Sequence, residues 1–192
     1  MSVLDDAPYV HADDRATWRA WLEANHATAR GAWLVTWRAR SGRVRLDYEG
    51  ALEEALCFGW VDSTGGHVDA DRGKLYFAPR KLRSPWAASN KARVERLIRE
   101  GRVAPSGFAA IERAKVSGSW DILDAAERLE VPEDLAAALE TRPPAATNFA
   151  AFPRFARRLM LGWVALARRP QTRATRVAKI AEAAARNERV RG

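Results

Sequence analysis

Cysteine and histidine are scarce in this chain. The one cysteine, Cys57, cannot form an intramolecular disulfide, and the apolar run 55–58 around it is typical of a small buried side chain. A reactive thiol is the alternative. The histidines are scattered and fit no zinc-binding spacing, so we expect no metal; they are His11, His26 and His67.

Long apolar runs and phosphate-binding loops are also missing. No stretch approaches the roughly 18 consecutive apolar residues of a membrane-spanning helix, and residues 1–6 have neither the basic nor the apolar part of a secretory leader. We therefore expect a cytoplasmic protein. Neither Gly-x-Gly-x-x-Gly nor a Walker motif occurs, and Gly65-Gly66-His67 is too short to replace them, so no cofactor is expected.

The length of 192 residues suits one domain. Helical periodicity and capping residues predict helices over 13–25, 48–58, from Ser84 onward, and over 105–116, 132–140, 153–167 and 171–187. Runs rich in aromatic and β-branched residues predict strands at 32–38, 60–63 and 74–78. The pattern predicts an α+β fold, with a small antiparallel sheet packed with helices and a mostly helical C-terminal half. Within the single domain 1–192, the sheet-containing core spans 13–120 and a helical basic part spans 121–192.

Two of these helices have an assignable inner face. In helix 48–58 the inward stripe is Ala51, Leu52, Ala55 and Leu56, and the largely outward residues are Glu49, Glu53 and Glu54. In helix 153–167 one packing stripe is predicted opposite the arginines; it consists of Phe152, Phe155, Leu159, Trp163 and Leu166. The arginines are Arg154, Arg157, Arg158 and Arg168.

Basic charge is concentrated at the C-terminal end. The net charge is +8, and residues 151–192 alone have eleven Lys and Arg against two Glu. A flank of helix 171–187 presents Arg173, Arg176 and Lys179, with spacing suited to nucleic-acid phosphates. A solvated helix face is the alternative explanation of the same charges.

Aromatic and polar residues gather around the predicted sheet. Eight tryptophans are many for this length, and most must belong to the core. The best candidate for a ligand pocket combines aromatic walls with a few polar groups; its members are Trp60, Asp62, Tyr76, Arg80, Trp86 and Asn90. Arg80 could bind a carboxylate or phosphate bidentately, and Asp62 could hold that arginine.

Other interpretations of these residues are open. Trp60 and Trp86 could be core, Asp62 and Arg80 could pair with each other, and Asn90 could cap a helix. An enzyme using Asp62 with Arg80, or with a nearby histidine, is a further alternative.

Several motifs occur in order along the chain. They are Glu54-Ala55-Leu56-Cys57-Phe58-Gly59-Trp60-Val61-Asp62-Ser63, Tyr76-Phe77-Ala78-Pro79-Arg80-Lys81, Ser84-Pro85-Trp86 with Ser89 and Asn90, Gly118-Ser119-Trp120, and Thr172-Arg173-Ala174-Thr175-Arg176-Val177-Ala178-Lys179-Ile180. Over roughly 13–187 the chain resembles the bacterial YdeI/OmpD-associated, bacteriocin-protection family, in which threonine is commoner at position 78. The resemblance implies protection from bacteriocins or antimicrobial peptides and no catalytic mechanism. We therefore expect a non-catalytic protein that binds a small molecule or an antimicrobial peptide, with nucleic-acid binding as the alternative.

Overall fold

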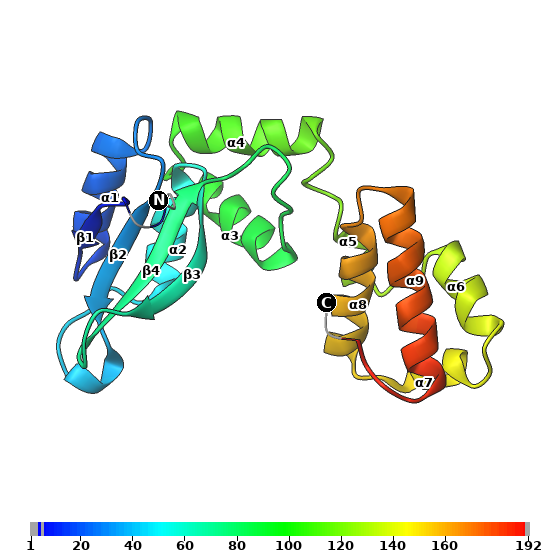
Figure 1. Cartoon of the computed structure of the whole chain (residues 1–192). Helices are drawn as coiled ribbons and strands as arrows, with labels where there is room; N and C mark the ends of the chain where they lie inside the picture. Colours follow the sequence, from blue (N-terminus) through cyan, green and yellow to red (C-terminus); the bar gives the residue numbers. More distant parts are fainter. Residues whose placement is uncertain (1–3, 5, 191–192) are drawn as a thin grey trace. The chain divides into compact units, whose positions relative to one another are not determined.

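The computed structural model describes residues 4 and 6–190 (Figure 1). The expectation about a secretory leader concerns residues 1–6, and of these residues 1–3 and 5 lie outside the described part of the chain. The chain divides into an N-terminal unit, residues 1–84 with 89–119, and a C-terminal unit, residues 85–88 with 120–192. Within the described residues, no helix combines the length and the apolar character needed to cross a membrane.

A four-stranded sheet forms the centre of the N-terminal unit. Its strands are β1 (Tyr9–His11), β2 (Ala32–Trp37), β3 (Trp60–His67) and β4 (Arg72–Pro79), in the order β1-β2-β4-β3. The antiparallel pairs β2–β4 and β3–β4 confirm the predicted sheet. The three-residue strand β1, which pairs parallel to β2, was not predicted from the sequence. The α+β fold class is confirmed.

Two helices cover one face of this sheet: α1 (Arg15–Asn25) and α2 (Tyr48–Cys57) (Figure 1). Both begin where the sequence predicts, because Asp14 and Asp47 accept hydrogen bonds from backbone N–H groups in the first turn. Trp18 of α1 packs on Phe77 of β4, with ring centroids 5.4 Å apart. The short helix η1 (Ala39–Ser41) follows β2.

Helices α3 (Ala88–Arg99) and α4 (Pro105–Val116) complete the N-terminal unit. The bounds of α4 agree with the prediction. The prediction that a helix begins at Ser84 is wrong: α3 begins at Ala88, and the Ser84 hydroxyl accepts a hydrogen bond from Arg80 Nη1 at 3.4 Å instead of capping a helix.

The C-terminal unit is helical. It contains α5 (Asp124–Glu127), α6 (Glu133–Glu140), α7 (Ala145–Ala151), α8 (Arg154–Ala165) and α9 (Pro170–Ala185). Its core includes Leu135, Phe149, Met160, Val164 and Ile180. Helix α9 contributes Val177, Ile180, Ala181 and Ala184 to this core, and all four are buried.

Candidate functional site

The two rings expected to wall one pocket lie on opposite faces of the sheet. Trp60 packs edge-on against Trp21 of α1, with ring centroids 5.9 Å apart, on the helix-covered face. Tyr76 points the other way and contacts Trp33, with centroids 5.2 Å apart. Side chains alternate between the faces of a strand, and Trp60 is paired with Pro79, three residues after Tyr76. The structure therefore does not bring these two rings together.

The polar residues expected at the pocket have partners in the N-terminal unit. Asp62 accepts a hydrogen bond from the Tyr48 hydroxyl at 3.1 Å. Arg80 is buried, and this burial lowers the pKa of its guanidinium to about 10, while the charge of Asp62 acts in the opposite direction. The Asn90 side-chain oxygen lies within α3 and accepts from Arg93 Nη1 at 3.2 Å.

Trp86 belongs to the C-terminal unit and is buried there against Trp120, with ring centroids 4.9 Å apart. The six residues expected to form one pocket are thus divided between two sheet faces, one helix and a second unit. Within the described part of the chain, no three His, Cys, Asp or Glu side chains are placed to hold a metal ion.

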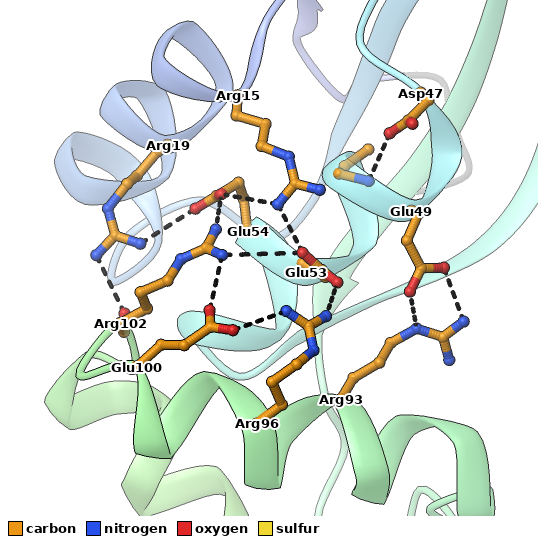
Figure 2. A network of polar contacts seen from close by, with 12 residues as sticks. Arg15, Arg19, Asp47, Glu49, Glu53, Glu54, Arg93, Arg96, Glu100 and Arg102 are labelled. Atoms are coloured by element: carbon orange, nitrogen blue, oxygen red, sulfur yellow. Dashed lines mark hydrogen bonds and ion pairs between the residues drawn. The ribbon is translucent and has the colours of Figure 1, made fainter.

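A network of ion pairs in the N-terminal unit surrounds two buried carboxylates of α2 (Figure 2). Glu53 pairs with Arg15 at 2.6 Å and with Arg96, and Glu54 pairs with Arg19 at 3.1 Å and with Arg102.

The prediction that Glu53 and Glu54 face outward is wrong, because each is only 2% exposed. Glu49, by contrast, is partly exposed and pairs with Arg93 at 2.6 Å. The arginines come from α1, α3 and the segment after α3. A buried carboxylate needs such partners to offset its lost hydration, so we interpret the network as the element that joins these helices.

The thiol of Cys57 lies one turn after this pair of glutamates and is buried. Burial raises its pKa, the charge of Glu54 raises it further, and Arg102 and Arg19 oppose the shift. A protonated, inaccessible thiol is a poor nucleophile. We therefore expect Ellman's reagent to label native Cys57 at least about tenfold more slowly than the urea-unfolded chain at neutral pH. Equal labelling rates would contradict the burial.

The basic flank expected to contact nucleic acid is partly engaged inside the C-terminal unit. Arg173 forms two hydrogen bonds to the Asp134 carboxylate, at 2.6 and 2.9 Å, and this pairing lowers the pKa of Asp134. Arg176 donates to the Trp163 carbonyl and lies over the Trp163 ring, 5.0 Å from its centroid. Lys179 is exposed.

The most unusual surface of the C-terminal unit runs along α8. The predicted inward stripe is right for Phe152, which is buried, and for Trp163, which packs on the core, but wrong for three residues: Phe155 is 63% exposed, Leu159 49% and Leu166 37%. The opposite side of α8, with Met160 and Val164, packs into the core. The α8 surface, as we call it, comprises Phe155, Leu159, Trp163 and Leu166. Larger exposed apolar patches on protein surfaces are typical of interaction sites.

Two hollows border the α8 surface and share Leu159. The larger, about 790 Å³, lies between Phe155 and the segment 187–190. The smaller, about 250 Å³, lies between α8 and α5 and is lined by Leu159, Trp163 and Leu166. The strip therefore has a recess on either side.

Arginines hold the aromatic rings of this surface in place. The Arg158 guanidinium lies 5.5 Å from the centroid of the Phe155 ring and also pairs with Glu127 at 2.8 Å. Arg176 covers Trp163 as described above. Because each ring contacts a cation, the α8 surface combines apolar area with a positively charged border.

Comparison with known families gives two matches. Residues 128–187 match the family described as bacteriocin-protection, YdeI or OmpD-associated, and residues 10–110 match the family described as a domain of unknown function, DUF8412. The first match contains the whole of α8; the expected resemblance is therefore confirmed in this part, whereas the motifs at 54–63 and 76–90 lie in the second match.

No curated protein and no solved structure matches the chain. The chain thus belongs to the DUF8412 family, whose model covers residues 10–110, and its residues 128–187 are similar to the bacteriocin-protection, YdeI or OmpD-associated family.

Proposed function

We propose that the chain is a peptide-binding protein with a role related to bacteriocin protection, and that the α8 surface holds the peptide. The single observation that carries this proposal is the apolar strip of the exposed Phe155, Leu159 and Leu166 with the partly buried Trp163, which lies in the segment matching the bacteriocin-protection family. Apolar surface that stays in water contributes nothing to folding stability, whereas a partner that covers it gains the hydrophobic free energy of its burial.

The strip has the dimensions of a site for an amphipathic helix. From residue 155 to residue 166 a helix advances about 16 Å, or three turns. A helical peptide with apolar side chains at i, i+4, i+7 and i+11 presents a stripe of about the same length. Its side chains would enter the hollows on either side of Leu159.

Charge favours a peptide with acidic flanks. Residues 151–192 have a net charge of +9, and Arg158 and Arg176 border the strip. A peptide with acidic residues beside its apolar face meets complementary charge there, whereas a cationic peptide meets repulsion. The proposed ligand is therefore an amphipathic helical peptide with acidic flanks.

Two synthetic peptides with the same apolar face test this proposal, one flanked by Glu and one by Lys. We expect the Glu-flanked peptide to bind the full chain with a dissociation constant on the order of 10 μM, measured by fluorescence anisotropy, and the Lys-flanked peptide to bind at least about tenfold more weakly. Leu159→Asp should weaken the binding of the Glu-flanked peptide by about tenfold or more, because it places a desolvated charge in the strip.

Val116→Asp is the matched control, since Val116 is an 89% exposed apolar residue of the N-terminal unit. It should leave binding unchanged. Equal binding by Leu159→Asp and the unchanged chain would overturn the site, and preference for the Lys-flanked peptide would overturn the assigned charge. Binding of short single-stranded DNA with a steep salt dependence, in place of peptide binding, would support the nucleic-acid alternative.

A further inference from the structure

A second concave region lies in the N-terminal unit, apart from every residue used above for peptide binding. It is a hollow of about 260 Å³ between β2, the start of α2 and the β3–β4 hairpin. We call it the β2–α2 groove and define it by five of the residues that line it: Trp37, Arg38, Arg45, Tyr48 and His67.

Cationic side chains dominate the border of the groove. The segment 38–45 contains four arginines and no acidic residue. Arg40 donates to the Ala70 carbonyl, and Arg43 lies over the Trp37 ring, 4.3 Å from its centroid. Arg38 and Arg45 line the groove itself, and no carboxylate in the described part of the chain lies within ion-pair distance of either. Their guanidinium groups can therefore meet an anion.

The carboxylate among the residues that line the groove serves as a helix cap. Asp47 lines the groove, and one of its oxygens accepts the Gly50 N–H at 2.7 Å as the cap of α2. Asp62 does not line it and is bound to the Tyr48 hydroxyl. Burial and the charge of Asp62 raise the pKa of Tyr48, so the phenol stays protonated and adds no negative charge at neutral pH.

Apolar walls complete the groove. Leu34 and Leu75, which pair across β2 and β4, form its floor, and the Trp37 and Tyr48 residues border it. Flat apolar walls with convergent donors are typical of small-ligand sites. The volume is below the roughly 300–1,000 Å³ of sites for drug-sized molecules, so the ligand must be smaller.

We infer that the β2–α2 groove binds a small molecule that combines a planar apolar ring with one anionic group. Arg38 and Arg45 receive the anion, and the ring lies over the Leu34 and Leu75 floor. This site is independent of the α8 surface and belongs to the unit that matches the DUF8412 family.

Amide NMR titration of the full chain with 2-naphthoate tests the inference. We expect saturable shifts at residues 36–38, 45–48 and 66–67, with a dissociation constant of about 1 mM for a ligand of this size. The neutral analogue 2-naphthalenemethanol should bind at least about fivefold more weakly, because it offers the arginines no charge.

The double variant Arg38→Ala with Arg45→Ala should bind 2-naphthoate at least about fivefold more weakly than the unchanged chain. Arg83→Ala with Arg99→Ala removes the same charge from exposed positions of the same unit that do not line the groove, and should leave the affinity unchanged. Unperturbed amide positions elsewhere confirm that each variant is folded. The inference is overturned by shifts that map to α8, by equal affinity in the two double variants, or by no saturation up to about 10 mM.

Discussion

The Glu54→Ala variant is expected to unfold in urea with a free energy of unfolding about 2–3 kcal/mol below that of the unchanged chain. Glu54 is 2% exposed and joins Arg19 of α1 to Arg102 after α3. Removing one partner of a buried pair costs roughly 3–5 kcal/mol when the other charge stays buried. Arg19 and Arg102 are about 30% exposed and regain some hydration, so we expect the smaller figure.

Glu95→Ala is the control for this variant, because Glu95 is an exposed acidic residue of α3. Its effect should stay within about 0.5 kcal/mol. Tryptophan fluorescence follows both transitions. If Glu54→Ala and Glu95→Ala unfold at the same urea concentration, the network does not hold the helices together and our interpretation is wrong.

The Gly107→Ala variant should lose about 3 kcal/mol or more of stability, although alanine is a better helix former than glycine. Gly107 lies in the first turns of α4, where a Cβ atom would be 2.2 Å from the Cys57 carbonyl oxygen and 2.8 Å from Val103 Cγ1. A backbone oxygen cannot rotate away as a flexible side chain could. Alanine therefore forces α4 away from the end of α2.

The same substitution at another glycine, Gly162→Ala, should change stability in the opposite direction. Gly162 is also helical and buried, but its added Cβ would meet Leu123 Cδ2 at 3.5 Å, an ordinary contact. Helix propensity should then stabilise the C-terminal unit by up to about 1 kcal/mol. Thermal unfolding followed by circular dichroism measures both changes. A Gly107→Ala protein as stable as the unchanged chain would show that α4 does not pack on α2 as described.

Features that depend on neighbouring residues could be predicted from the sequence. The starts of α1 and α2 could be predicted because their caps, Asp14 and Asp47, each act on a backbone group three residues away. Glu53 and Glu54 were placed on the wrong side because their partners are 35 to 48 residues away in the sequence. A charged residue on a short helix is ordinarily solvated, and only the tertiary structure shows the arginines that make burial possible.

Helical periodicity alone could not predict which side of α8 faces the core. Residues 159–165 are uninterruptedly apolar or small, so two stripes fit the same helix. Phe155, Leu159 and Leu166 were assigned to the core but are exposed, whereas Met160 and Val164 occupy it. This uninterrupted apolar run is the feature of the sequence that could have indicated a helix with two apolar sides. Similarly, alternation along β3 and β4 could not show that Trp60 and Tyr76 face opposite ways, because their relative position depends on the pairing register.

Amide NMR mapping of the Glu-flanked peptide on the full chain tests the central claim most directly. If the α8 surface is the peptide site, saturable shifts should concentrate on residues 155–166 and on the segment 187–190 that borders the larger hollow. The Leu159→Asp variant should lose them while keeping its other amide positions. Shifts confined to the N-terminal unit, or to the outer flank of α9 at Lys179, would contradict the claim.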